Sequence, residues 1–129
     1  MDKYKILFVD DEVNILNSLR RGLRLHCPDW QVKFCSSAAD ALLLLKGFEP
    51  LVVVCDKRMP DIDGIAFLRT VSKQTPEMIR VLLTGDNATE MTLEAAGVAH
   101  MVIAKPFQIE VLVQLLHRAL SLHKIPVSL

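Results

Sequence analysis

Five polar residues stand at the ends of short apolar runs in this 129-residue sequence: Asp10, Asp11, Asp56, Thr84 and Lys105. Carboxylates held a few ångströms apart repel one another, and two charges about 4 Å apart interact with about 4 kcal/mol at an effective dielectric of 20. A divalent cation relieves that repulsion, and an all-oxygen ligand set with room for water suits Mg²⁺ better than zinc or copper. We therefore predict a magnesium site with Asp11 and Asp56 as direct ligands and Asp10 acting partly through water.

The same residue types suit phosphoryl transfer to a carboxylate. An aspartate beside Mg²⁺ can attack phosphorus, because the metal neutralises charge on the phosphoryl oxygens. Asp56 is the candidate nucleophile, since it follows the most strand-like run of the chain, LVVVC at 51–55. Lys105 supplies a cation for one phosphoryl oxygen, and the Thr84 hydroxyl can donate to another.

Apolar runs and amphipathic segments alternate along the chain, which predicts the elements that position these residues. Strands are expected at 4–9, 30–35, 51–55, 78–83 and 98–104, and helices at 12–26, 38–46, 65–73, 88–96 and 108–123. Ser36–Ser37 supplies capping chemistry for the second helix, and Gly47 is expected to end it. Five strands alternating with five helices predict an α/β fold with a doubly wound parallel sheet. Ligands bind such sheets at the carboxyl ends of the strands, so the five polar residues should converge there.

The composition limits the class of protein. Fifteen Lys and Arg balance fifteen Asp and Glu, and 51% of the residues are hydrophobic, which predicts one compact domain with a single core. The balanced charge disfavours direct nucleic-acid binding, and we interpret Arg20, Arg21 and Arg24 as a solvated helix face. Three irregularly spaced cysteines and the absence of a long apolar run predict a cytoplasmic protein without disulfides or membrane contact.

Four segments together resemble a two-component response-regulator receiver domain of the CheY-like superfamily. They are ILFVDDE at 6–12, VVVCDKRMPDIDG at 52–64, LLTG at 82–85 and AKPF at 104–107. The likeness extends over residues 4 to about 122. It implies a flavodoxin-like sheet with strand order 2-1-3-4-5, a receiver domain over residues 1–123, and a tail or the start of a linker at 124–129.

The resemblance also implies roles for the polar residues. Asp56 would accept a phosphoryl group from a histidine kinase or phosphotransfer protein, Thr84 would switch, and Lys105 would pair with the phosphate. The implied magnesium ligands are the side chains of Asp10, Asp11 and Asp56 and the backbone carbonyl of Arg58. The Lys105–Pro106 bond would be cis. The domain would not be an enzyme beyond self-phosphorylation from a phosphodonor and slow autodephosphorylation.

Three features depart from the family or extend it. Val102 stands three residues before Lys105, where receivers usually carry an aromatic that swings inward with the threonine. His100 lies on the same side of the expected strand, and we interpret it as an exposed strand histidine. The stretch from Thr84 to Lys105 is a residue or two short for the family, so the helix at 88–96 is expected to be truncated or irregular.

Arg58 and Asp86 each stand two residues after a site residue. We hypothesise that they pair, partly shield the attacking water and lengthen the phosphorylated lifetime. The alternative is a surface ion pair worth about 0–1 kcal/mol.

The last helix has more apolar residues than one core stripe needs. Its stripe comprises Ile109, Leu112, Val113, Leu116 and Leu120. Val111, Leu115 and Leu122 lie off that stripe, which predicts a homodimer or effector surface formed by the elements at 88–96, 98–104 and 108–123. The alternative is a wide buried face.

Three functions remain open from the sequence. The first is a phosphorylation-driven signalling switch. The second is an interaction module that keeps the fold without using phosphate, which the valine at position 102 leaves open. The third is an aspartyl-phosphate phosphatase, disfavoured because short loops leave no evident substrate pocket or general acid. RVLLTG and MPDIDGIAFL also resemble receivers attached to HD-GYP cyclic-dinucleotide phosphodiesterases.

Overall fold

The computed structural model describes the backbone of residues 4–85 and 95–124, with side chains up to Ser121. Five parallel strands form one sheet in the order β2-β1-β3-β4-β5. Their bounds are Lys5–Val9 (β1), Gln31–Cys35 (β2), Val52–Asp56 (β3), Ile79–Thr84 (β4) and Met101–Ala104 (β5). The predicted fold class and strand order are therefore confirmed.

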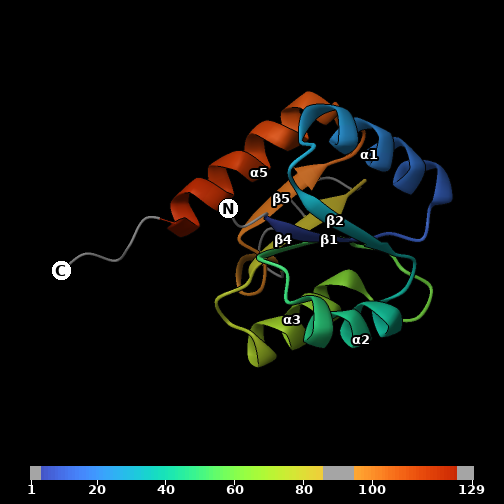
Figure 1. Ribbon diagram of the computed structural model, residues 1–129. Coiled ribbons are helices and arrows are strands. Elements are labelled where there is room, and N and C mark those ends of the chain that lie inside the picture. Colours follow the sequence, from blue (N-terminus) through green and yellow to red (C-terminus); the bar gives the residue numbers. More distant parts are fainter. Residues whose placement is uncertain (1–3, 86–94, 125–129) are drawn as a thin grey trace.

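Helices cover both faces of this sheet. They are α1 (Val13–His26), α2 (Ala38–Phe48), α3 (Gly64–Gln74) and α5 (Ile109–Lys124). Helices α1 and α5 pack on one face, and α2 and α3 pack on the other (Figure 1). The helix expected at 88–96 lies mostly outside the described residues. Its last two residues, Ala95 and Ala96, are described and are helical. Its predicted irregularity falls on that undescribed part.

The central strand explains why the sheet forms. Every residue of β3 is buried, and its three consecutive valines have the β-branched side chains that suit a strand covered on both faces. Side chains alternate along it, so Val53 and Cys55 join the core under α2 and α3, while Val52 and Val54 join the core under α1 and α5. The predicted single core is thus two apolar layers separated by the sheet.

Two predicted boundaries differ from the structure by more than one residue, and the others within the described residues agree to within one. Helix α2 continues past Gly47 to Phe48, whose side chain is buried, and ends where Glu49 adopts a left-handed backbone with φ of 51°. Strand β5 begins at Met101 instead of at residue 98, because the Val98 N–H donates to the Ala95 carbonyl in a helix-terminal turn. Local apolar character predicted a strand there, but the turn takes those backbone groups.

The strand ends determine where the polar residues lie. Asp56 and Thr84 are the last residues of β3 and β4, and Asp10 and Lys105 directly follow β1 and β5. Asp56 is in register with Leu83 of β4, and Thr84 with Ala104 of β5. Because all five strands are parallel, these residues meet at one edge of the sheet.

The surface of β5 and α5 carries exposed apolar side chains. Val102 is 37% exposed and Val111 is 44% exposed, whereas Leu115 is half-buried. The side chain of Leu122 lies outside the described part of the chain. Within the described residues, no helix combines the length and apolar character that a membrane crossing requires.

Candidate functional site

One lysine contacts three carboxylates at the carboxyl ends of the strands. The Lys105 Nζ lies 3.1 Å from Asp10 Oδ2, 3.2 Å from Asp56 Oδ1 and 3.2 Å from Glu12 Oε1. Asp10 is 1% exposed and Asp56 is 6% exposed, so the ion pairs with these two acids are shielded from bulk water, whereas Glu12 is exposed. The lysine therefore compensates part of a buried negative charge.

Three of the acids are close enough to share one cation. Single carboxylate oxygens of Asp10, Asp11 and Asp56 all lie within 4.8 Å of one another. Asp11 is exposed, so the group opens to solvent on its side. Hard oxygen donors, partial burial and one exposed member fit a small divalent cation that keeps some of its water, which is the preference of Mg²⁺.

The electrostatics of the cluster also fit a cation. Burial raises the pKa of the Asp56 carboxyl, and the neighbouring Asp10 raises it further, while Lys105 acts in the opposite direction. Burial lowers the pKa of the Lys105 ammonium, but its contacts with Asp10 and Asp56 outweigh that effect and the net pKa is raised. Lys105 therefore stays charged. Its charge does not fully offset the burial of Asp56 and the repulsion from Asp10, because the pKa of Asp56 remains raised.

The cluster lines a cleft of about 590 Å³. Asp11, Asp56, Thr84 and Lys105 contribute to its walls, as does Arg58. The Lys105 backbone N–H donates to the Thr84 carbonyl at 2.7 Å, which ties the end of β5 to the end of β4. The bond from Lys105 to Pro106 is cis, as the resemblance implies. The structure thus brings together all the site residues expected at strand ends.

Backbone contacts fix the loop that follows Asp56. The Gly64 N–H donates to the Lys57 carbonyl at 2.7 Å, and the Lys57 N–H donates to the Leu83 carbonyl at 2.8 Å. A Cβ on Gly64 would collide with the Asp56 carbonyl oxygen and lie 2.9 Å from the Lys57 Cα. Glycine is needed here because the start of α3 approaches the backbone of the candidate nucleophile so closely.

A second anchor of this loop is an acid that the sequence did not single out. The Asp61 carboxylate accepts hydrogen bonds from the backbone N–H groups of Ala38, at 3.3 Å, and Ala39, at 3.0 Å. These bonds lower the pKa of the Asp61 carboxyl, the Ala39 bond having the largest effect. Asp61 therefore caps the first turn of α2 from another loop, beside the Ser37 hydroxyl, which accepts from the Asp40 N–H as predicted.

Sequence reasoning also missed Glu12 as a site residue. Besides contacting Lys105, its backbone N–H donates to Asp10 Oδ1 at 2.9 Å and so orients that buried carboxylate. The available signal was a third acid directly after Asp10 and Asp11, but its contact depends on where β5 delivers Lys105.

Three other residues named from the sequence do not join this cluster in the described part of the chain. His100 precedes β5, and its Nδ1 accepts the Arg80 backbone N–H at 2.9 Å, so the exposed histidine is attached to β4. Val102 lies on β5 opposite Leu82. Asp86 lies outside the described residues, so its pairing with Arg58 stays a prediction.

The fold, the acidic cluster and the adjacent lysine together define a class of protein. A model of the response regulator receiver domain family matches residues 6–117, and the chain belongs to that family. The hydrogenase transcriptional regulatory protein HoxA of Bradyrhizobium diazoefficiens is 36% identical over 123 residues, which cover 93% of this chain and 24% of that protein. The C4-dicarboxylate transport transcriptional regulatory protein DctD of Rhizobium meliloti is 31% identical over 115 residues, covering 88% and 25%. The chain spans about a quarter of the length of these curated relatives.

Solved structures show the same architecture. The signal receiver domain of an HD domain-containing protein from Pseudomonas fluorescens Pf-5 is 29% identical with a TM-score of 0.86, covering 95% of this chain and 98% of that chain. A CheY-like response regulator receiver domain protein from Methanospirillum hungatei JF-1 superposes with a TM-score of 0.88 over 95% of this chain and 98% of that chain. At 23% identity, the second likeness shows the fold alone.

Proposed function

We propose that this receiver domain is a phosphoacceptor switch of a two-component system and that Asp56 is the accepting residue. The single observation that carries the proposal is the group of Asp10, Asp11 and Asp56 oxygens within 4.8 Å, with Lys105 in ion-pair contact with two of these acids. A structural ion pair needs one acid, whereas a site for a phosphoryl group and its metal needs several groups in one cleft.

In the proposed reaction, a carboxylate oxygen of Asp56 attacks phosphorus and forms a new O–P bond. The bond from phosphorus to the donor histidine nitrogen breaks, and its electron pair leaves with the imidazole. Lys105 then pairs with a phosphoryl oxygen, and the Thr84 hydroxyl donates to another. Because a phosphoryl group is larger and more negative than a carboxylate, Lys105 has to redistribute its contacts with Asp10 and Glu12, which couples phosphorylation to the end of β5.

Asp10, Asp11, Asp56 and the Arg58 backbone carbonyl would hold Mg²⁺. The metal would supply positive charge for the transferring phosphoryl oxygens. The protein's own contribution is positioning: Glu12 orients Asp10, Asp61 and Gly64 fix the loop after Asp56, and Lys105 supplies the permanent cation.

We propose a histidine kinase or phosphotransfer protein as the donor and an effector domain or a second copy as the recipient of the switch. The relatives HoxA, DctD and AtoC are regulatory proteins of which this chain spans about a quarter, which supports an effector partner. Exposed Val102 and Val111 support contact through β5 and α5. We place the domain in the cytoplasm, without direct nucleic-acid binding, and propose no catalytic turnover beyond its own phosphorylation and slow dephosphorylation.

The test is incubation with acetyl phosphate and Mg²⁺ followed by intact-mass measurement. We expect one phosphoryl adduct on the wild-type chain, none on Asp56→Asn, and an unchanged adduct on Asp29→Asn, which alters an exposed acid elsewhere. An adduct that persists in Asp56→Asn would contradict the proposed acceptor. Rapid release of phosphate from varied esters would favour a phosphatase instead.

A second candidate function is an interaction module that works without phosphate, favoured by Val102. An aromatic at this position could move between buried and exposed arrangements, whereas a 37% exposed valine has little surface to exchange. The two functions differ in one readout: a switch changes its dimer or effector affinity when acetyl phosphate is added, and a constitutive module does not.

A further inference from the structure

Strand β2, at the outer edge of the sheet, has backbone groups that no described residue pairs with. Strand β2 has β1 as its only neighbour in the sheet. The Gln31 N–H donates to the Tyr4 carbonyl and the Cys35 carbonyl accepts from the Asp10 N–H, so odd-numbered residues face β1. Backbone groups alternate along a strand, which directs the N–H and C=O of Val32 and Phe34 outward. No backbone group of the described residues pairs with them there.

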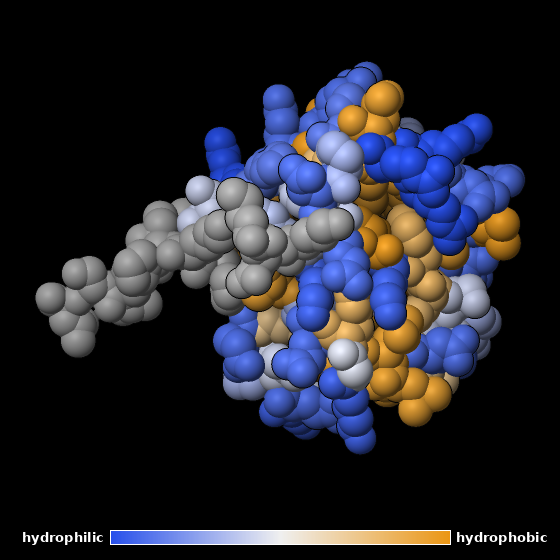
Figure 2. All heavy atoms as spheres, in the orientation of Figure 1, coloured by the Kyte–Doolittle hydropathy of each residue, from blue (hydrophilic) through white to orange (hydrophobic). Residues whose placement is uncertain are grey.

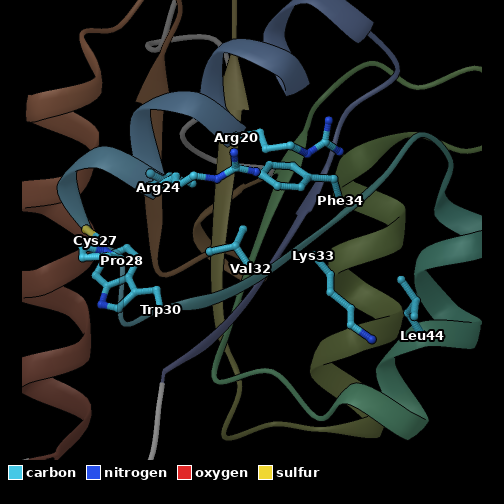
Figure 3. A pocket seen from close by; sticks show the side chains of 10 residues that line it. Arg20, Arg24, Cys27, Pro28, Trp30, Val32, Lys33, Phe34 and Leu44 are labelled. Atoms are coloured by element: carbon cyan, nitrogen blue, oxygen red, sulfur yellow. The ribbon is translucent and has the colours of Figure 1, made fainter.

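A groove of about 490 Å³ runs along this edge between α1 and α2. Arg20 and Arg24 extend from α1 toward β2, and Lys33 extends from the strand toward the side where Leu44 of α2 lies (Figure 3). In the space-filling view, a band of apolar surface broken by hydrophilic groups crosses this face of the molecule (Figure 2). The groove therefore offers apolar floor, free backbone edge and positive charge together.

No described carboxylate neutralises the positive charge of the groove. Its lining contains three cations, Arg20, Arg24 and Lys33, and no carboxylate. None of the three forms an ion pair with any described carboxylate. Aromatic rings hold two of them instead: the Arg20 guanidinium lies 4.8 Å from the Phe34 ring centroid, and the Lys33 Nζ lies 4.9 Å from the Phe48 ring centroid. Cations fixed over rings keep their charge available for a partner.

We propose that the β2 edge binds an extended acidic segment of a partner protein, which adds to the sheet as a sixth strand. Peptide backbone supplies both the N–H donors that the Val32 and Phe34 carbonyls need and the acceptors that their N–H groups need. Alternate side chains of the added strand then point toward the arginines on one face and toward Leu44 on the other, so acidic and apolar residues should alternate.

The same features disfavour other occupants. A nucleic-acid backbone matches the cations, but its phosphates are acceptors only and leave the Val32 and Phe34 carbonyls unpaired. A second copy pairing edge to edge would bring two sets of Arg20, Arg24 and Lys33 together, and like charges at a sheet edge oppose such pairing. The inference does not depend on phosphorylation of Asp56.

Trp30 is the only tryptophan of the chain and lines this groove, so its fluorescence reports on the site. Its ring also contacts the His117 ring at 4.9 Å between centroids, which gives a defined free state. The probe is an acetylated, amidated peptide of alternating Glu and Val, about seven residues long to span one strand. We expect a saturable fluorescence change, and none with the matched peptide of alternating Lys and Val.

A pair of charge reversals on α1 separates the groove from general electrostatics. Arg24→Glu alters a lining residue, and Arg21→Glu makes the same change on the same helix outside the lining. We expect Arg24→Glu to weaken binding on the order of tenfold and Arg21→Glu to have less than about a twofold effect. Equal losses in the two variants would overturn the proposed location.

Backbone N-methylation of the probe tests strand addition itself. Two peptides are made, one methylated on the backbone nitrogens of its odd-numbered residues and one on those of its even-numbered residues. One peptide then lacks the N–H groups that face β2, and the other lacks those that face solvent. We expect one methylated peptide to lose binding and the other to keep it. The peptide that binds should change the amide NMR chemical shifts of Val32 and Phe34. Equal affinity of both methylated peptides, or a single-stranded oligonucleotide that binds as tightly as the peptide, would overturn the proposal.

Discussion

The cleft at the carboxyl ends of the strands holds buried negative charge, whereas the free edge of β2 holds exposed positive charge. In the cleft, Asp10 and Asp56 are almost fully buried and share one lysine. At the edge, Arg20, Arg24 and Lys33 are exposed. The formal net charge of zero therefore conceals two oppositely charged regions. Composition alone disfavours a partner held by bulk charge but says nothing about such local sites.

The two regions also differ in how tightly their charges are coupled to the fold. Burial and neighbouring charges shift the pKa of Asp56 and Lys105, so the charges of the cleft contribute to the free energy of unfolding. The cations of the edge are exposed and form no ion pairs with described carboxylates. Substitutions in the cleft should therefore change stability, and substitutions at the edge should change binding with little effect on stability.

The largest expected effect comes from removing the cation of the cleft. Lys105→Met leaves Asp10 and Asp56 buried without their shared partner, and breaking a buried ion pair costs about 3–5 kcal/mol. We expect that loss in urea denaturation at neutral pH, shrinking as the pH falls because protonation removes the unpaired charges. Lys33→Met at the edge serves as the control and should stay within about 0.5 kcal/mol. Equal effects of the two substitutions would remove the distinction between the regions.

The second largest expected change in stability comes from Mg²⁺ binding in the cleft. A ligand that binds only the folded state adds about 2.7 kcal/mol at a free concentration one hundred times its Kd. We expect Mg²⁺ to raise the Tm of the wild-type chain and Asp11→Asn to weaken that response on the order of tenfold or more. Asp29→Asn alters an exposed acid near β2 and should respond like wild type. A Tm that rises equally with Mg²⁺ in Asp11→Asn would contradict the predicted ligand.

Alanine substitutions at two glycines should change stability by smaller amounts and in opposite directions. Gly64→Ala places a Cβ against the Asp56 backbone, and overpacking of this kind costs about 1–3 kcal/mol. Gly47→Ala meets nothing within 4 Å inside α2 and should stabilise by about 0.5–1 kcal/mol, the difference in helix propensity. Thermal unfolding measures both effects. Slower formation of the phosphoryl adduct is expected in Gly64→Ala alone, since only that change places a Cβ against the backbone of the proposed acceptor.

The smallest effects are expected in the titration of two acids, Asp56 at the end of β3 and Asp61 in the loop that follows it. The pKa of Asp56 is raised, so its ionised form is disfavoured in the folded state and stability declines as the pH rises from the unfolded to the folded pKa. The pKa of Asp61 is lowered, so its contribution is present above the unfolded pKa and is lost as the pH falls through the folded pKa. Carboxyl ¹³C NMR without Mg²⁺ should show Asp56 titrating at higher pH than Asp61. The reverse order would contradict the assigned environments.

The sequence predicted the order of elements because buried parallel strands are continuous apolar runs that end in polar residues, as at Asp56. It failed where an element boundary depends on distant contacts. Gly47 is typical of a helix end, but α2 continues to Phe48 because that side chain is buried in the core. Val98 has the character of a strand residue, but its carbonyl accepts from the buried Arg80 side chain at 2.6 Å.

The candidate site could be predicted from the same polar strand ends, but its supporting contacts could not. Asp61 and Ala39 are 22 positions apart, and Glu12 and Lys105 are 93 positions apart. No local pattern specifies such pairs. The arginines of α1 give the same lesson: the sequence grouped Arg20, Arg21 and Arg24 as one solvated face, whereas Arg20 and Arg24, but not Arg21, line the β2 groove.

Locating the phosphoryl group by reductive trapping tests the central claim most directly. After incubation with acetyl phosphate and Mg²⁺, borohydride reduces an aspartyl phosphate to homoserine, and peptide mapping identifies the converted residue. We expect homoserine at position 56 alone, dependent on Mg²⁺ and reduced in Asp11→Asn. Conversion at Asp10 or Asp11 instead, or no Mg²⁺-dependent conversion at all, would contradict the proposal that this acidic cleft is a phosphoacceptor site.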